Sequence, residues 1–479
     1  MSIYYLPAEI NDLIAKLLDT YSFLSLKLTN TYWFQLLNCD QYPQNASLKT
    51  EQICHLVLTQ QQNLFITGPG GCGKTYTIQQ LQKRALALNK NIYITATTGI
   101  AATNFENGYT IHGFSGLGLG KQTLDQIQTI FYEKHKLPGM NRLRQVDILV
   151  IDEVSMLTAD ILDKVDLVLR LSRVNNKPMG GVQLVLCGDF LQLPPVGGKY
   201  IFDSKIWKQL NLIVFNMTIP VRQSNDLKYF RLLTRIRTLT HTQDDISSLQ
   251  FRVAEYKKLN LDGLLIKPTI IYANNKDVDA INQAEFNKLT TPIDLTVAAY
   301  DELFERIETN YRPIYQPTTK ISLTVAKSKI STQLSRKCPD TISFRPGAQY
   351  ILTYNLNIKT GLVNGSRCVY IGNNQLQFLN DTIISIKPRK FFFPVGNNFY
   401  LSRLQIPLRL GYAITIHCSQ GMSLDSAIID LKNGIRYNSQ IYVALSRVRN
   451  LNSLYLVDFD SNKIKASKQA LAFYGLNAI

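Results

Sequence analysis

The sequence predicts an α/β protein that contains two cores, with a basic, β-rich insertion inside the second core. In the first core, from Leu48 to about Arg235, short apolar runs alternate with helical patterns, as in proteins built on parallel sheets. A fresh strand and helix begin at Pro268, and residues 293–404 then break the alternation. The alternation resumes at Gln405, which indicates that both flanks of the insertion belong to one core.

These observations divide the chain of 479 residues into five segments. A chain of this length is typical of roughly two to four domains. The expected segments are a helical N-terminal module (1–45), the first core (46–235), the first part of the second core (236–292), the insertion (293–404) and the second part of the second core (405–479).

The net charge indicates a polyanionic partner. The chain carries 52 Lys and Arg residues against 35 Asp and Glu residues, a formal net charge of +17, and such an excess favours binding to a polyanion. Much of the excess lies in residues 321–410, where only Asp340 and Asp381 are acidic. Just before this region, residues 301–308 are locally acidic, and we expect them to form the solvated face of a helix.

Cysteine spacing and hydropathy argue against a zinc site and a membrane role. Seven cysteines occur, but none forms a C-x-x-C pair or another paired metal-ligand spacing. We therefore expect reduced thiols in an intracellular protein. No apolar run approaches the roughly 18 residues of a membrane-spanning helix, and the N-terminus lacks the basic start and apolar core of a secretory signal.

A glycine-rich loop predicts a nucleotide site. The loop follows the apolar strand Asn63–Thr67 and opens a helical pattern. Its glycines let consecutive backbone N–H groups point at the α- and β-phosphates, Lys74 reaches the β- and γ-phosphates, and the hydroxyl of Thr75 ligates Mg²⁺. A plain glycine-rich turn is the alternative, and it requires that no acidic partner strand follow. The predicted nucleotide-binding residues of the loop are Gly68, Gly70, Gly71, Cys72, Gly73, Lys74 and Thr75.

An acidic strand end does follow the loop. Residues 147–152 form a continuous apolar run, typical of a buried parallel strand, and the run ends in Asp152 and Glu153. We expect Asp152 to hold Mg²⁺ through water and Glu153 to polarise the attacking water as general base. A solvated acidic strand end is the alternative, which the preceding loop disfavours. Together the two motifs predict hydrolysis of a nucleoside triphosphate.

Seven further segments carry a family resemblance. They are Ala96–Ala102, Thr110–His112, Asp163–Leu184, Gly188–Val196, Gly361–Arg367, Ala413–Asp425 and Tyr442–Arg447. In this order they resemble the motifs of the petite integration frequency (PIF) helicases of superfamily one, alongside the RecD-type enzymes. The resemblance covers roughly residues 48–460.

The resemblance implies two RecA-like cores with parallel sheets that flank ATP, and a small Src-homology-3-like β-barrel as the insertion. Gln192 is then expected to sense the γ-phosphate or to orient water, and Arg222 and Arg447 to be arginine fingers. A guanidinium suits that role because it binds phosphate oxygens in pairs and stays charged. Gln52 resembles the family's adenine-reading glutamine, and Gly421 is assigned to the nucleotide site. The alternatives are a surface-loop glutamine, surface ion pairs for the arginines and a solvated helix residue at position 52.

The same resemblance assigns residues to a DNA-binding face. Single strands are held by cationic grooves and by flat side chains on which bases stack. The residues implied are Thr98 and His112 on the first core and Thr415, His417 and Ser419 on the second. A lone histidine is more often a satisfied core residue, and only the motif context reverses that expectation. Phe114 and the basic-aromatic run 387–394 are further candidates for base stacking, with packing inside the barrel as the alternative for the run.

Two features depart from the family pattern. Cys418 stands where the family usually has lysine, which removes one cation from the DNA-facing motif. Residues 5–38 lie outside the usual helicase core and resemble a degenerate F-box, a helical adaptor that docks ubiquitin-ligase subunits. The alternative for the N-terminal residues is a helical cap over the first core.

The resemblance implies an ATP-dependent DNA helicase that moves 5′→3′ on single-stranded DNA and unwinds duplex. Its expected cofactors are ATP and Mg²⁺, and its expected partners are single-stranded and forked DNA. The chain is expected to be monomeric. The F-box resemblance adds a ubiquitin-ligase adaptor as a partner of residues 1–45. The expected processes are DNA replication, recombination, repair or telomere maintenance, in the nucleus, in the mitochondrion or in a virus-infected host cell. An RNA-directed helicase, a translocase that does not unwind, and a substrate adaptor stay open as alternatives.

Overall fold

The computed structural model describes residues 45–476, except 103, 106, 118–119, 135–139, 274–277, 310–311, 318–320, 355, 358–359, 361, 396–398, 432–434 and 436–437. The F-box-like segment and nearly all of the predicted N-terminal module therefore lie outside the described residues. Asn45 is the exception, because it begins the first described helix, α4.

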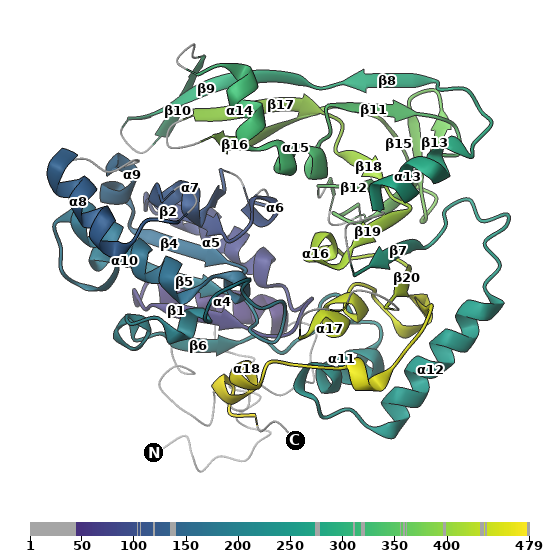
Figure 1. Cartoon of the computed structure of the whole chain (residues 1–479), viewed down its shortest axis with the longest axis horizontal. Coiled ribbons are helices and arrows are strands. Elements are labelled where there is room, and N and C mark those ends of the chain that lie inside the picture. The colour runs from purple at the N-terminus through teal and green to yellow at the C-terminus, as the bar shows by residue number, and fades with distance from the viewer. Residues whose placement is uncertain are drawn as a thin grey trace, which may run out of the picture.

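The first core is built on a six-stranded parallel sheet in the order β3-β2-β4-β5-β1-β6 (Figure 1). Its strands are β1 (Leu64–Thr67), β2 (Ile92–Ala96), β3 (Tyr109–Thr110), β4 (Ile148–Asp152), β5 (Gln183–Cys187) and β6 (Ile213–Asn216). Strands β1, β2 and β4 are buried along their whole length. A parallel sheet covered on both faces requires such continuous apolar runs, so the predicted fold class is confirmed for this core.

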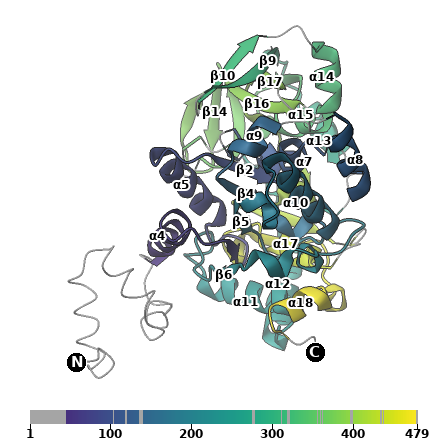
Figure 2. The same ribbon diagram turned by 90° about the vertical axis from the view of Figure 1, so that its left-hand side faces the viewer.

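Two layers of helices cover this sheet. On one face lie α4 (Asn45–Leu58) and α5 (Lys74–Ala87), whose apolar side chains share a core with strands β1, β2 and β4. On the other face lie α7 (Ile111–Ser115), α8 (Leu124–Lys134), α9 (Met140–Gln145) and α10 (Ala159–Arg173). Figure 2 shows the sheet between these layers. A short helix, α6 (Gly99–Ala102), follows β2.

The second core has a four-stranded parallel sheet in the order β19-β7-β20-β21. Its strands are β7 (Thr269–Tyr272), β19 (Ala413–Thr415), β20 (Ala427–Asp430) and β21 (Leu454–Leu456). Strands β7 and β19 pair directly although the whole insertion separates them in sequence. The helices of this part are α11 (Leu227–Thr238), α12 (Gln243–Lys258), α13 (Val278–Asn287), α16 (Ile416–Ser419) and α17 (Gln440–Leu445). The predicted pair of parallel-sheet cores is therefore confirmed.

The insertion contains a five-stranded antiparallel sheet in the order β15-β14-β13-β12-β18 and a two-stranded sheet of β8 and β11. The strands are β8 (Leu295–Ala298), β11 (Thr341–Phe344), β12 (Gln349–Leu352), β13 (Arg367–Gly372), β14 (Gln375–Phe378), β15 (Ile383–Ser385) and β18 (Leu408–Leu410). Both sheets contribute to one apolar core around Phe344, Tyr350 and Tyr370. The pairing of the described strands is that of an open sheet, so the closed barrel stays a prediction.

A second inserted sheet shows that the expectation of a solvated acidic helix was wrong. The acidic residues lie in strand β9 (Tyr300–Thr309), which pairs with β10 (Arg312–Pro317) and β17 (Phe399–Gln405), and β17 also pairs with β16 (Arg389–Val395). Asp301 is buried against Arg403 of β17, with which it forms a two-pronged ion pair of 2.6 and 2.7 Å. Because the cation that neutralises Asp301 is distant in sequence, local composition suggested solvation. The short helices α14 (Leu323–Lys329) and α15 (Ser331–Lys337) pack beside this sheet.

Two segments from outside the first core pack onto it. The ring of Tyr400, in β17, meets the ring of Tyr109 edge-on at 5.9 Å. Helix α18 (Lys468–Phe473) follows the second sheet in sequence, yet Phe473 packs against Phe65 and Phe190 of the first core. The described residues contain no helix that is long and apolar enough to cross a membrane.

Candidate nucleotide site and nucleic-acid face

The glycine-rich loop lies between β1 and α5 in a conformation that requires glycine at two positions. Gly68 and Gly71 have φ of 139° and 88°, and a Cβ atom would lie 2.1 Å from the carbonyl oxygen of Met217 in the first case and 2.7 Å from Cβ of Arg222 in the second. A backbone curled without side chains is the cradle that a phosphate fits. The predicted phosphate loop therefore has the geometry that its sequence requires.

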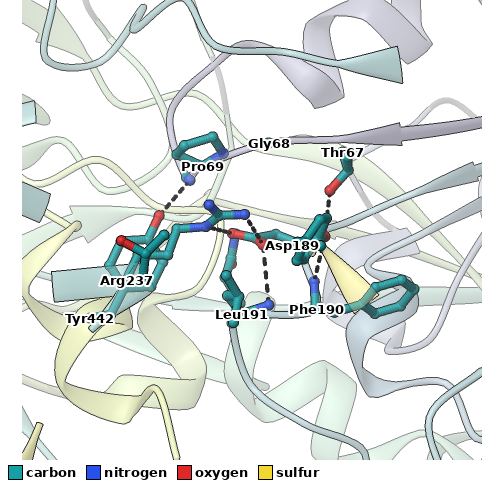
Figure 3. Close-up of polar contacts among 12 residues, drawn as sticks. Thr67, Gly68, Pro69, Asp189, Phe190, Leu191, Arg237 and Tyr442 are labelled. Atoms are coloured by element: carbon teal, nitrogen blue, oxygen red, sulfur yellow. Dashed lines mark hydrogen bonds and ion pairs between the residues drawn. The ribbon is translucent and has the colours of Figure 1, made fainter. Parts of the chain in front are cut away.

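Lys74 and the N–H of Gly70 are the polar groups at the centre of this loop. Nζ of Lys74 donates to the carbonyl oxygens of Gly68 and Pro69 at 2.7 and 2.9 Å, and Gly70 donates its N–H to the hydroxyl of Tyr442 at 2.9 Å (Figure 3). Tyr442 belongs to α17 of the second core. A side chain of the second core thus contacts one of the N–H groups predicted to hold phosphate.

Two carboxylates lie at the end of β4. Asp152 is buried, and its Oδ1 accepts the N–H of Glu153 at 2.9 Å. Burial, and next the negative charge of Glu153, raise the pKa of Asp152 to about 7. Burial also raises the pKa of Glu153, whose Oε2 accepts a hydrogen bond from Nε2 of Gln420 at 2.9 Å. A divalent cation would relieve this crowding of negative charge, so the pair fits a metal site.

Gln192 lies beside a buried ion pair at the other edge of the loop. Asp189 is fully buried and accepts two hydrogen bonds from Arg237, at 2.7 and 2.9 Å (Figure 3). Nε2 of Gln192 lies 3.4 Å from Oδ2 of Asp189, and Gln192 itself is buried. The alternative of a surface-loop glutamine is therefore wrong.

Arg222 contacts the loop from one side and bonds to the second core. Its Nε donates to Oγ of Ser423 at 2.7 Å and its Nη1 to the carbonyl oxygen of Ser446 at 2.8 Å. Desolvation and the positive charge of Arg447 lower its pKa to about 9. Its partners are thus oxygens of the second core and not a surface carboxylate.

Arg447 is buried beside the same loop. Its Nη1 donates to the carbonyl oxygen of Ser419 at 3.1 Å, and its Nε to that of Val443 at 2.7 Å. A Cβ atom on Gly70 would lie 3.3 Å from Nη2 of Arg447. Burial lowers its pKa. Both predicted arginines therefore converge on the phosphate loop, and the alternative of surface ion pairs is wrong.

Gln52 and Gly421 complete the predicted nucleotide site. Gln52 lies on α4 with only 2% of its surface exposed, and its Nε2 has no hydrogen-bond partner among the described residues. A buried amide without a partner fits recognition of a polar base edge, and it excludes the solvated helix residue. Gly421 is exposed, with φ of 80° and open space where its Cβ would lie.

The predicted DNA-facing threonines have matching positions on the two cores. Oγ1 of Thr98, after β2, accepts the N–H of Ala101 at 3.2 Å, and Oγ1 of Thr415, after β19, accepts that of Cys418 at 3.2 Å. Each threonine caps the short helix, α6 or α16, that follows its strand. Thr415 is only 3% exposed, and Ser419 is fully buried, with its hydroxyl donating to the carbonyl oxygen of Ile416 at 2.7 Å.

The two predicted histidines are half-buried. His112 lies on α7, where burial, and next the positive charge of Lys164, lower its pKa. His417 lies on α16, whose outer side borders a cavity of about 1020 Å³. The lining of this cavity includes the cations Lys327, Arg345 and Arg409, together with Thr415 and Cys418. Arg345 and Arg409 thus line the same cavity as the cysteine that replaces the usual lysine.

The aromatic candidates for base stacking pack mainly inside the protein. Phe114 is fully buried, with its ring 5.3 Å from that of Tyr93. Phe391 and Phe393 lie in the apolar core beneath the four-stranded inserted sheet. Phe392 is 38% exposed. The stacking prediction was therefore wrong for Phe114. Phe391 and Phe393 pack inside the protein, as the alternative expected, but in the core of the four-stranded sheet and not in that of the predicted barrel.

Several residues of the site were not singled out from the sequence. Gln420 and Tyr442 lie inside segments that carried the resemblance, but their partners, Glu153 and Gly70, belong to the other core. Arg237 lies in an ordinary amphipathic helix, so no local signal pairs it with Asp189. Such contacts arise only when the two cores come together.

Comparisons with known proteins agree with this geometry. The model of the PIF1-like helicase family matches residues 44–240. The chain is 34% identical over 449 residues to the ATP-dependent DNA helicase PIF1 of Xenopus laevis, covering 90% of this chain and 65% of that protein. It is 30% identical over 506 residues to the ATP-dependent DNA helicase RRM3 of Saccharomyces cerevisiae, covering 90% and 68%. The chain thus spans less than two thirds of the length of the vertebrate relatives that it matches.

Solved structures give the same result. A Bacteroides Pif1 in complex with ADP-AlF4 superposes with a TM-score of 0.67 at 26% identity, over 89% of this chain and 96% of that one. A Bacteroides Pif1 in complex with ADP-AlF3 and single-stranded DNA gives 0.58 at 25% identity, over 89% and 96%. On the strength of its motifs, its two cores and these relatives, the chain belongs to the PIF1-like helicase family.

Proposed function

We propose that this chain is an ATP-driven motor that moves 5′→3′ along single-stranded DNA and unwinds duplex. The observation that carries the proposal is the convergence of Arg222, Arg447 and Tyr442 on the glycine-rich loop of the first core. A nucleotide in this loop would be contacted from the second core, so its binding and loss would change how the two cores fit together. The names of the relatives support DNA as the polymer along which the chain moves and ATP as the nucleotide that it hydrolyses.

The residues of the first core fit ATP and Mg²⁺. The unpartnered amide of Gln52 suits an adenine edge, and the glycine cradle with Lys74 suits the phosphates. Thr75 and Asp152 would hold Mg²⁺, which neutralises charge on the β- and γ-phosphates when bound. Glu153 would accept the proton of the attacking water, and Gln192 would orient that water.

Arg222 and Arg447, the latter from the second core, would supply positive charge to the transferring phosphate. Arg222 and Arg447 lie against the loop with pKa values that burial lowers, and their guanidinium groups are held by neutral oxygens. A dianionic phosphate would therefore be a stronger partner than their present ones. Arginine fingers of this kind contribute on the order of 10³ or more to turnover.

We propose that the track passes along the face where α6 and α16 are capped by threonines. We assign Thr98 and His112 of the first core and Thr415 and His417 of the second to this face, and the cavity lined by Thr415 would add Arg345 and Arg409. Thr415 and Ser419 would contribute through their backbone, since their side chains are buried. Four further proposals rest on the family alone. They are the 5′→3′ polarity, the monomeric state, forked DNA as substrate, and a role in replication, recombination, repair or telomere maintenance in the nucleus or mitochondrion.

Steady-state ATP hydrolysis with and without single-stranded DNA, beside matched RNA, tests this proposal. We expect strong stimulation by DNA, followed by unwinding of duplexes with a 5′ tail and not of those with a 3′ tail. Stimulation by RNA alone would show that the chain moves along RNA and not along DNA. Stimulation by DNA without strand separation would show a translocase that does not unwind duplex. The absence of hydrolysis under every condition would overturn the proposal.

A further inference from the structure

The turn formed by α16 and Gln420 contacts two catalytic groups at once. Nε2 of Gln420 donates to Oε2 of Glu153 at 2.9 Å, across the boundary between the cores. One residue earlier, the carbonyl oxygen of Ser419 accepts from Nη1 of Arg447 at 3.1 Å. The other end of the same turn is Thr415, on the proposed DNA face. We propose that Gln420 is a positioning residue that orients the Glu153 carboxylate in response to DNA on α16, an inference that rests on the proposed function.

Gln420 is well placed to orient Glu153. A general base works best when a third group fixes its direction, as in nucleophile–base–orienter arrangements. A carboxylate has two oxygens, so the amide that holds Oε2 leaves Oε1 for the proton of water. Glu153 adopts φ of 55°, a conformation unusual for a residue with a side chain, so its backbone sets the direction in which the side chain leaves the chain. The hydrogen bond from Gln420 then sets the orientation of the carboxylate at the end of that side chain.

The turn is short and internally bonded, so it moves as one piece. Oγ1 of Thr415 accepts the N–H of Cys418 at 3.2 Å, and Oγ of Ser419 donates to the carbonyl oxygen of Ile416 at 2.7 Å. Thr415 and Cys418 are buried, so a phosphate would have to engage α16 through the half-buried His417, and we infer that a displacement of this helix would move Gln420 as well. Because Gln420 follows this helix directly, the displacement reaches Glu153 through one side chain.

Replacing Gln420 by methionine tests the inference, because methionine keeps the length of the side chain and removes the donor. We expect kcat with single-stranded DNA to fall roughly 10- to 100-fold, since small misplacements of a catalytic group cost about that much. Because the hydrogen bond between Gln420 and Glu153 is present without DNA, we expect kcat without DNA to fall as well, but by less than kcat with DNA. KM for ATP and the affinity for a fluorescent oligonucleotide should stay within about twofold. The ratio of the two kcat values, the DNA stimulation, therefore falls.

Two further variants separate positioning from general damage. Gln420→Asn keeps the amide but shortens its reach by one methylene, so it should lose stimulation as Gln420→Met does. Gln79→Met is the matched control, because Gln79 donates one hydrogen bond at 3.0 Å to a backbone carbonyl, that of Asn104, and not to a carboxylate of the site. We expect it to keep the stimulation of the wild type.

The outcomes distinguish this inference from the proposed function. Full stimulation in Gln420→Met, or an equal fall of both kcat values, would show that Gln420 does not transmit DNA binding, and would overturn the inference alone. A wild-type chain that hydrolyses no ATP would overturn the proposed function and the inference with it.

Discussion

At the scale of single residues, the candidate site was largely predictable because the residue types and spacing within each motif indicate its chemical role. Gly68 and Gly71 are required by local backbone geometry, and the acids after β4 follow from an apolar strand that ends in charge. Gln52, Gln192 and Arg447 were assigned by resemblance, and burial supports those assignments. Phe114 was misjudged because an aromatic side chain looks the same in sequence whether it stacks on a base or on Tyr93.

Replacing Lys74 by alanine should abolish ATP hydrolysis. Lys74 is the cation bonded within the phosphate loop, so its removal takes away the charge expected on the β- and γ-phosphates. Binding of single-stranded DNA should stay within about threefold of the wild type, since Nζ of Lys74 bonds within the phosphate loop and not to the threonine-capped helices. Hydrolysis is followed by phosphate release and DNA binding by fluorescence anisotropy. Unchanged turnover in a purified variant would refute the site assignment.

Replacing Asp152 by asparagine should stabilise the protein without nucleotide above pH 7. Burial raises the pKa of Asp152 from its usual value near 4 to about 7, so the folded state binds the proton more tightly and the charged carboxylate weakens folding at high pH. The penalty is absent below about pH 4 and complete above about pH 7, and it amounts to about 2–4 kcal/mol. Urea unfolding at pH 5 and pH 8 measures it. A variant with the same advantage at both values would contradict this assignment of the charge.

At the scale of secondary-structure elements, the strands were easier to predict than their partners. Runs such as 63–67 and 147–152 predicted β1 and β4 to within one residue, because a fully buried strand has a continuous apolar sequence. Strand β9 was predicted as a helix because its acidic residues find Arg403 and Lys390 only in distant strands. Periodicity and composition carry no information about such long-range charge pairing.

Replacing Arg237 by methionine should destabilise the protein by about 3–5 kcal/mol, because it leaves a buried charge unpaired. Arg237 joins α11 to the segment after β5 through two hydrogen bonds to Asp189, which is fully buried. The double variant with Asp189→Asn should recover a large part of that loss, since the neutral amide costs less to bury. Urea unfolding of both variants gives the difference. Equal stability of the single and double variants would show that the buried charge is not the cause.

At the scale of the whole molecule, the chain returns twice to its first core, through Tyr400 of the insertion and through α18 with the Tyr474 that follows it. Neither return was visible in the sequence, where the residues after 405 were assigned to the second core. The hydroxyl of Tyr474 contacts Oγ1 of Thr67 at 2.6 Å and accepts the N–H of Phe190 at 3.2 Å (Figure 3). It therefore links the two strand ends that carry the phosphate loop and the Asp189 segment.

Replacing Tyr474 by phenylalanine should therefore raise KM for ATP several-fold, because the phosphate loop loses a support at Thr67, the residue that precedes it. The matched control is Tyr412→Phe, which removes a hydroxyl that accepts the N–H of Gln349 at 3.0 Å, outside the first core. Tyr412→Phe should lose about 1 kcal/mol of unfolding free energy, the usual worth of one hydrogen bond, and Tyr474→Phe about 2 kcal/mol, since its hydroxyl makes two. Only Tyr474→Phe should change KM, since only its hydroxyl touches the base of the loop. Equal changes of KM in both variants would show that lower stability causes the effect. The contact of Tyr474 with the first core would then contribute to folding and not to ATP binding.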